Sequence, residues 1–205
     1  LVLDDLGYGK PTLVLADLRA LSADDKKFVT AIMKAAEVIE RLYAKQTGMQ
    51  GLEGKLPKDA ASRALFFRNQ GYACAAPKTQ LIPECTAIPG APRGKQSGLY
   101  PASLLGKEGF CDELPKTDKA LMEPFVVVQE KKGKLEAVPY TTVWKDEMKQ
   151  VSALLDTAGK AVTDPAEGPL KAYLAAAAKG FLTNDWVPAD EAWAKMNVSN
   201  SKWYL

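Results

Sequence analysis

The chain has no histidine among its 205 residues. Histidine is the side chain whose ordinary pKa lies nearest neutral pH, and it is the commonest metal ligand in proteins. Its absence excludes, within this chain, a Ser-His-Asp or Cys-His catalytic set and a histidine-ligated zinc ion. Either the protein works without such chemistry, or the histidines belong to sequence outside this chain.

Charge bias and long apolar runs are also missing. There are 27 Lys and Arg against 25 Asp and Glu, and the densest basic cluster is Lys131, Lys132 and Lys134. This balance predicts no nucleic-acid partner and no binding to an anionic membrane. The apolar run at residues 13–16 is far too short to cross a bilayer, so no transmembrane segment is expected. The hydrophobic content of 47% suits a real core in one large domain or two small ones.

Cysteines are few, and no two form a Cys-X-X-Cys pair. Cys74 and Cys85 bracket a proline-rich stretch, which is a natural place for a disulfide in an oxidising compartment; free buried thiols are the alternative. Cys111 would then meet a cysteine on sequence outside this chain or pack as a small apolar residue. The possible pairing favours a periplasmic or exported protein, with a cytoplasmic location as the alternative.

Helical periodicity dominates the part of the chain that follows an irregular lead-in at residues 1–20. A long amphipathic helix is expected to begin at Ser22, with Asp25 in a capping-box position, and to end at Gly48. Apolar spacing, proline positions and small residues predict further helices. These lie at residues 57–69, 101–110, 144–158, from Pro169 through Phe181, and 189–196.

Two short apolar runs, at residues 125–129 and 135–140, indicate a β-hairpin. Residues 71–98 hold too many prolines and glycines for a regular element, so they form either a functional loop or a surface crossover stapled by cysteine. Residues 201–205 look like the beginning of a strand. The predicted fold class is α+β, mainly α, with helices packed around a small hairpin and a long Pro-rich loop.

Aromatic side chains are the most suggestive candidates for a binding site. They could line an apolar groove for a peptide, although core packing is the better explanation for each one when it is taken alone. The carboxylates, in contrast, fall on helix caps and solvated faces, so no catalytic residue and no metal ligand is predicted in this chain. The aromatic candidates are Tyr100, Tyr140, Trp186, Trp193, Trp203 and Tyr204.

Several phrases, taken in order, resemble the N-terminal half of the dipeptidyl peptidase III-like zinc metallopeptidases, in particular the short bacterial members and the peptidase-like part of plant proteins with a Nudix domain. The phrases that carry the resemblance are Gly98-Leu99-Tyr100-Pro101-Ala102-Ser103-Leu104, Glu123-Pro124-Phe125-Val126-Val127-Val128, Leu135-Glu136-Ala137-Val138-Pro139-Tyr140, Leu170-Lys171-Ala172-Tyr173-Leu174, Ala178-Lys179-Gly180-Phe181-Leu182 and Asp190-Glu191-Ala192-Trp193.

The resemblance implies a mainly helical, two-lobed exopeptidase with a cleft between its lobes. In that family a His-Glu…His helix and a further glutamate supply the zinc ligands and the general base, and none of these residues can be placed on this chain. Residues 21–205 would then be the non-metal-binding N-terminal half and form one wall of the peptide cleft. The partner would be a C-terminal catalytic half of the same protein, which binds the zinc. The cleft candidates are Tyr100, Tyr140, Trp203 and Tyr204.

The alternative is a catalytically inactive binding or interaction module on the same scaffold. An ending inside the predicted strand at residues 201–205 favours the first interpretation, in which the chain is a fragment of a longer bacterial hydrolase.

Overall fold

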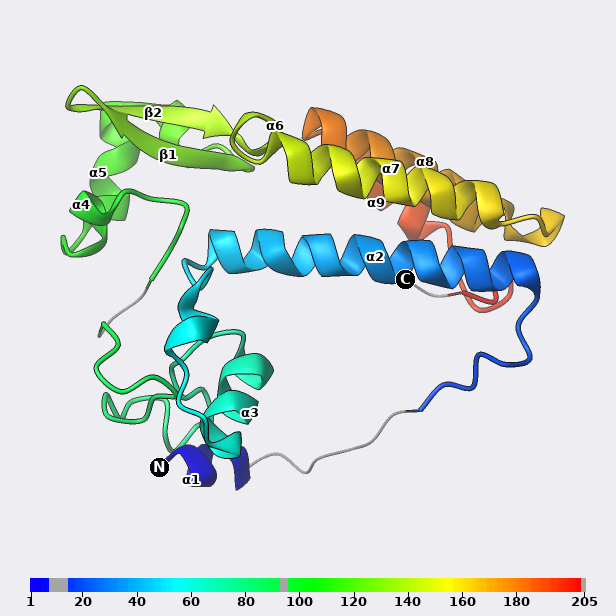
Figure 1. Cartoon of the computed structure of the whole chain (residues 1–205). Coiled ribbons are helices and arrows are strands. Elements are labelled where there is room, and N and C mark those ends of the chain that lie inside the picture. Colours follow the sequence, from blue (N-terminus) through cyan, green and yellow to red (C-terminus); the bar gives the residue numbers. More distant parts are fainter. Residues whose placement is uncertain (8–14, 93–95, 204–205) are drawn as a thin grey trace. The chain divides into compact units, whose positions relative to one another are not determined.

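The computed structural model describes residues 1–7, 15–92 and 96–203. The chain divides into two compact units, each built from two separate stretches (Figure 1). Unit 1 comprises Leu1–Leu15 and Tyr43–Glu108, and unit 2 comprises Ala16–Leu42 and Gly109–Leu205. The long helix α2 (Ala23–Gln46) runs through the boundary between them.

Unit 1 is a small unit of short elements. These are α1 (Val2–Gly7), the 3-10 turn η1 (Leu52–Lys55), α3 (Ala60–Asn69) and α4 (Ala102–Leu105). Helix α3 begins where Asp59 caps it by accepting a hydrogen bond from the Ser62 amide at 2.8 Å. Its buried face meets residues of the following loop in one core, and Val2 and Leu6 of α1 pack against that core. The core residues are Leu65, Phe66, Tyr72, Cys74, Cys85, Ala87 and Ile88.

The proline-rich segment of unit 1 has no helix or strand in its described part, as the sequence predicts. It is closed by a disulfide between Cys74 and Cys85, by a hydrogen bond from the Cys74 amide to the Cys85 carbonyl at 3.1 Å, and by an antiparallel bridge between Ala73 and Thr86. The disulfide therefore joins the two cysteines that the sequence proposed as a pair. Cys111, in contrast, is an exposed free thiol and does not pack in a core.

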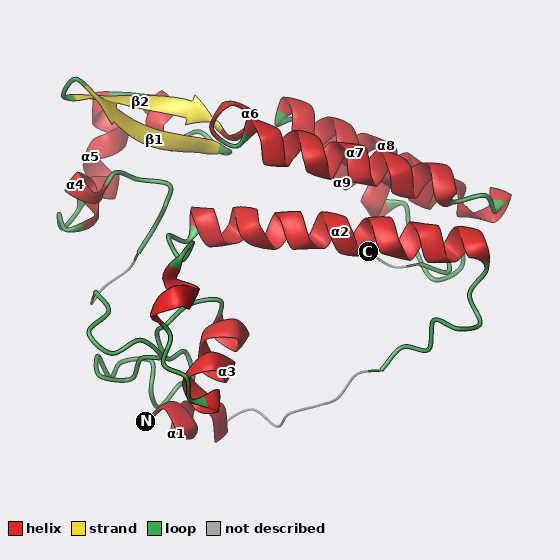
Figure 2. Ribbon diagram, viewed as in Figure 1, coloured by secondary structure: helices red, strands yellow, loops and turns green. Residues whose placement is uncertain are grey.

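Unit 2 is dominated by long helices, which Figure 2 draws in red. Helix α7 (Lys145–Ala161) packs along α8 (Gly168–Thr183), and α8 in turn packs against α9 (Val187–Ala194). Small residues on α8 allow close packing of these helices. The buried side chains of α2, α7 and α8 form the core of the unit: Phe28, Ala31, Ala35, Val38, Leu42, Val151, Leu155, Ala158, Leu170, Leu174, Ala177 and Ala178.

The β-hairpin of unit 2 pairs β1 (Val126–Lys131) with β2 (Lys134–Pro139) in antiparallel register. Lys132 and Gly133 connect the strands, and both have positive φ, at 50° and 76°. Such a two-residue turn matches the twist of a hairpin, and glycine adopts it without steric cost. The 3-10 turn η2 (Lys119–Met122) lies against the hairpin.

Short helices precede and follow the hairpin. Helix α5 (Phe110–Thr117) lies on its N-terminal side, and α6 (Tyr140–Val143) starts directly after β2. The fold class predicted from the sequence, mainly helical with one small hairpin, is confirmed.

Four local predictions differ from the structure. The lead-in at residues 1–20 contains helix α1, whose Val2 and Leu6 pack against the core of unit 1. The helix predicted from residue 57 begins at Ala60, because Asp59 caps it. The helix predicted over residues 101–110 ends at Leu105 before Gly106. Residues 201–203 form no strand, because the Ser201 hydroxyl and the Lys202 amide bind a carboxylate instead.

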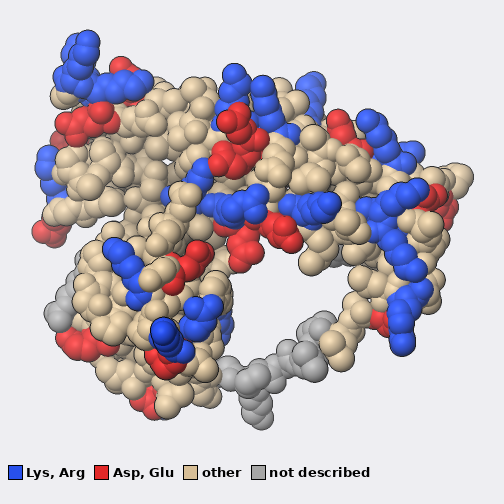
Figure 3. Space-filling model, viewed as in Figure 1, with Lys and Arg blue, Asp and Glu red and all other residues tan. Residues whose placement is uncertain are grey.

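Acidic and basic side chains lie next to one another over the hairpin and along α2 in Figure 3. This mixing agrees with the near balance of charges in the sequence. In the described ranges, each helix is either too short or too polar to cross a membrane.

Candidate functional site

Tyr140 belongs to a cluster of aromatic rings in unit 2, which we call the aromatic cluster: Phe125, Tyr140, Trp144, Phe181 and Trp186. The Tyr140 ring lies 4.6 Å from that of Trp144 and 6.1 Å from that of Phe125, measured between centroids. Trp186 lies 4.8 Å from Phe181 in an edge-to-face arrangement and 6.1 Å from Phe125. Such tilted and edge-on pairs are the favoured geometries of aromatic contact.

The hairpin register explains why two rings of the aromatic cluster meet. Val126 pairs with Pro139, so Phe125 and Tyr140 face each other one step beyond the ladder. The Tyr140 amide donates a hydrogen bond to the Phe125 carbonyl at 2.9 Å. Phe125 holds φ at 61°, which is unusual for a bulky residue, and its side chain is 40% exposed. The cluster therefore presents the ring of Phe125 to solvent beside rings that are buried or half-buried.

Trp203 lies at a second place in unit 2, where the C-terminal segment is fastened. Its ring packs against Phe28 of α2 with centroids 4.9 Å apart. The carboxylate of Glu167, which is only 3% exposed, accepts hydrogen bonds from the Ser201 hydroxyl at 2.6 Å and from the Lys202 amide at 2.7 Å. A buried carboxylate needs such partners, because an unpaired buried charge is very unfavourable. We call this arrangement the clasp.

An ion pair completes the clasp. Lys202 Nζ lies 3.0 Å from a carboxylate oxygen of Asp25 in the first turn of α2. The hydrogen bond from Lys202 holds the pKa of Asp25 below its usual value, and the same bond raises the pKa of Lys202. The Ser22 hydroxyl accepts a hydrogen bond from the Asp25 amide at 3.0 Å, as the predicted cap requires. Ser22 therefore caps the helix, and Asp25 anchors the C-terminal segment through Lys202.

A surface cavity of about 360 Å³ adjoins the clasp. Its lining combines the side chains of the clasp with the turn that connects α7 to α8, and it is mostly polar or charged. The residues that line it are Ser22, Asp25, Val162, Thr163, Asp164, Pro165, Glu167, Lys202 and Trp203.

The structure places Tyr140 and Trp203, two of the predicted cleft residues, at separate places in unit 2. Tyr140 begins α6, just ahead of α7, whereas Trp203 lies by Val162, just beyond the C-terminal end of α7. Since α7 has 17 residues, its two ends are about 25 Å apart. Tyr100 is half-buried and belongs to unit 1, and Tyr204 lies outside the described residues.

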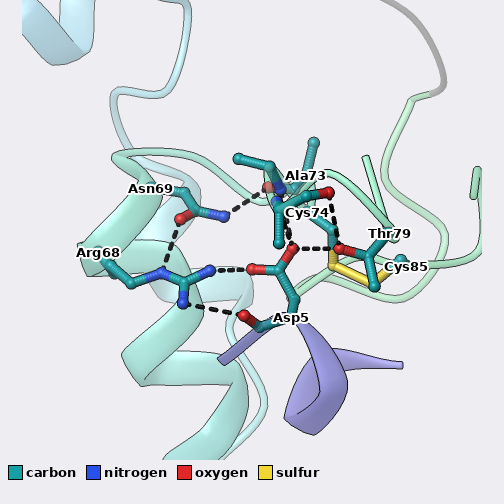
Figure 4. Close-up of polar contacts among 9 residues, drawn as sticks. Asp5, Arg68, Asn69, Ala73, Cys74, Thr79 and Cys85 are labelled. Carbon is teal, nitrogen blue, oxygen red and sulfur yellow. Dashed lines mark hydrogen bonds and ion pairs between the residues drawn. A yellow bond between two sulfur atoms is a disulfide. The ribbon is translucent and has the colours of Figure 1, made fainter. Parts of the chain in front are cut away.

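A third polar arrangement lies in unit 1 around Asp5, whose side chain is fully buried (Figure 4). Its carboxylate accepts hydrogen bonds from the amides of Ala75 and Ala76, both at 2.9 Å, and from the Thr79 hydroxyl at 2.5 Å. Arg68 of α3 forms an ion pair with the same carboxylate and also donates to the Asp5 carbonyl at 3.1 Å. We call this arrangement the Asp5 network.

The Asp5 network is also the group of described residues that most resembles a set of metal ligands. A carboxylate oxygen of Asp5 and the sulfurs of Cys74 and Cys85 lie within 4.8 Å of one another. Both sulfurs, however, belong to the disulfide, and the carboxylate already accepts four donors. Zinc prefers thiolate, imidazole and free carboxylate ligands, so these residues do not fit a zinc site.

Sequence reasoning missed the residues that organise the clasp and the Asp5 network. Asp5 meets partners 63 to 74 residues away, and Glu167 meets partners 34 and 35 residues away, so no local pattern reveals them. For Asp25 the sequence predicts only a capping-box position. In the sequence, these three carboxylates stand out only as acidic residues beside apolar ones. That pattern is too common to identify Asp5, Asp25 and Glu167.

Known protein structures share the fold of this chain. No family model matches the sequence, and no curated protein sequence matches it. Solved structures do match, and they show the fold. Dipeptidyl-peptidase III from Corallococcus sp. strain EGB superposes with a TM-score of 0.73 at 24% identity, over 96% of this chain and 37% of that one. DPP III from Caldithrix abyssi gives a TM-score of 0.61 at 20% identity, over 95% of this chain and 37% of that one.

The chain therefore shares its fold with part of dipeptidyl-peptidase III structures, and it spans 37% of their length. The resemblance noted in the sequence phrases is confirmed at the level of the fold.

Proposed function

We propose that this chain is the non-metal-binding, N-terminal segment of a zinc-dependent metallopeptidase of the dipeptidyl peptidase III type. The observation that carries the proposal is the superposition of 96% of the chain on 37% of such an enzyme. The lack of histidine supports a non-metal-binding role for this segment, because the zinc site and the general base must then lie on another part of the protein. The segment forms one wall of the peptide cleft.

The aromatic cluster is the best candidate for that wall. It presents the exposed ring of Phe125, while Tyr140 and Trp186 hold this ring in place. Aromatic faces bind peptide side chains over a large area with little loss of side-chain entropy. The clasp has a different part in this proposal: it fixes the course of the chain at Trp203.

The experiment is an intact mass and metal analysis of the native protein, captured from its source with an antibody against this chain. The proposal expects a species well above 22.2 kDa that contains zinc. A stable, metal-free 22.2 kDa monomer would overturn it. That result would support the alternative, a binding module without catalysis, which the exposed side chains of Val187 and Trp193 on α9 would suit.

We also propose a periplasmic or exported location, in which the Cys74–Cys85 disulfide persists. Alkylation of the native protein under denaturing conditions tests this. Labelling of Cys111 alone is expected, whereas labelling of all three cysteines would indicate the reducing cytoplasm.

A further inference from the structure

Helix α1 cannot be stable by itself. It has six residues, and isolated helices shorter than about 12–15 residues are marginal in water. Its order must come from what it docks against. Val2 and Leu6 pack on the core of unit 1, and the buried carboxylate of Asp5 enters the Asp5 network.

The loop closed by the disulfide supplies three of the four donors to that carboxylate: the amides of Ala75 and Ala76 and the hydroxyl of Thr79. Ala75 follows Cys74 directly, and all three residues lie between the two cysteines in the sequence. The loop contains no helix or strand. The covalent closure, with the backbone contacts beside it, therefore holds these donors in position.

We propose that the Cys74–Cys85 disulfide is a redox-sensitive lock that controls the docking of helix α1 on unit 1. A dithiol reductant transfers two electrons and two protons to the disulfide and is itself oxidised to a disulfide, leaving two cysteine thiols. The loop then regains conformational freedom, because its ends are no longer joined. Asp5 then loses three of the four donors that make its burial tolerable, and α1 leaves the core.

The lock acts on unit 1 alone. The disulfide lies in the core cluster of unit 1, and the described residues of unit 2 hold one cysteine, the exposed Cys111. The helix packing of α7 on α8 therefore provides an internal control in the same molecule. The lock does not depend on the proposed peptidase function.

Amide hydrogen exchange on the 205-residue chain tests the lock. The oxidised protein is compared with protein reduced by dithiothreitol, with the mass confirming two new thiols. We expect exchange at Ala75, Ala76 and Asp5 to rise about tenfold or more on reduction, since hydrogen bonds to a charged group are lost. Exchange in α7 and α8 should not change.

Two variants of neighbouring residues on α1 distinguish the contribution of the Asp5 network to amide protection from that of the disulfide. Asp5→Asn should raise exchange at Ala75 and Ala76 while the disulfide stays intact. Asp4→Asn is the matched control, because Asp4 is exposed and forms an ion pair with the amino group of Leu1 rather than with the loop. It should leave exchange at these amides unchanged.

Unchanged protection of Ala75 and Ala76 with both thiols free would overturn the proposal. Loss of protection throughout α7 and α8 would also overturn it, because the disulfide would then support the whole fold. If the buried disulfide resists dithiothreitol, hydrogen exchange is measured on the double variant Cys74→Ser with Cys85→Ser. The same rise in exchange at Ala75 and Ala76 is expected. Wild-type protection of Ala75 and Ala76 in that variant would contradict the lock.

Discussion

Different interactions stabilise the two units of this protein internally. Unit 2 relies on long helices that bury apolar faces, such as α7 on α8. Unit 1 has only short helices, and it adds a disulfide and a buried carboxylate with four donors. A small core supplies little stabilisation, so covalent and polar cross-links are needed where helix packing is limited. The units should therefore respond differently to the same kind of substitution.

The largest effect is expected in the helix core of unit 2. Leu174 of α8 is fully buried, so Leu174→Ala removes apolar contacts and leaves a cavity, lowering the free energy of unfolding by about 2–5 kcal/mol. Leu182→Ala, on the same helix but 50% exposed, is the control and should change stability by less than about 0.5 kcal/mol. Urea unfolding measures both. Equal effects would mean that α8 packing does not stabilise unit 2.

Unit 1 has a glycine at a point where two backbone segments come close together. Substituting it tests this close contact, whereas Leu174→Ala tests the burial of an apolar side chain. A Cβ at Gly98 would lie 1.8 Å from the Lys45 carbonyl oxygen, so Gly98→Ala must move the backbone and should cost about 1–3 kcal/mol. Gly106→Ala is the control, because nothing lies within 4 Å of its Cβ position. Hydrogen exchange within unit 1 distinguishes the two variants. A neutral Gly98→Ala would show that Gly98 does not lie this close to the Lys45 carbonyl.

The clasp tests a polar contact inside the helical unit. Glu167→Gln replaces a buried carboxylate that accepts two hydrogen bonds, and it should lower the free energy of unfolding by about 1–3 kcal/mol. Faster exchange at the Lys202 amide should accompany it. Glu191→Gln, on the exposed side of α9, is the control. If the two variants are equally stable, Glu167 does not anchor the C-terminal segment.

The smallest effect is expected from the ion pair of the clasp. The pKa of Asp25 is lowered in the folded protein by the hydrogen bond from Lys202. Its stabilisation is therefore present above the ordinary aspartate pKa of about 4 and is lost as the pH falls through the folded value. For Lys202, whose pKa is raised, stabilisation is present below about pH 10 and is lost as the pH rises through the folded value.

Stability measured from pH 2 to 7 checks this prediction against Lys202→Gln. The difference between wild type and variant should shrink as Asp25 is protonated. Lys27→Gln is the control, because Lys27 forms a more exposed pair with Asp24. A difference between wild type and Lys202→Gln that does not change with pH would contradict the ion-pair account.

Local pattern sufficed for the long helices and the hairpin of unit 2. Apolar residues at helical spacing located α2, α7 and α8, and the two apolar runs located β1 and β2. Short elements were harder. Helix α5 was missed because it has eight residues and contains Pro115, and α1 was missed because six residues give too little periodicity.

The candidate site was less predictable than the fold. Tyr140 and Trp203 stood out as aromatic residues, yet only the structure shows that they lie at opposite ends of α7. The burial of Asp5 and Glu167 depends on partners more than 30 residues away. Sequence spacing cannot give such contacts, because they depend on how the chain packs.

We propose above that this chain belongs to a zinc peptidase whose metal lies on another part of the protein. The most direct measurement is release of dipeptides from the N-terminus of a peptide by the native protein, with and without a chelator. The account predicts release that chelation abolishes and added zinc restores, and no release by the 205-residue chain alone. Release by the isolated chain, or release by the native protein that resists chelation, would contradict it.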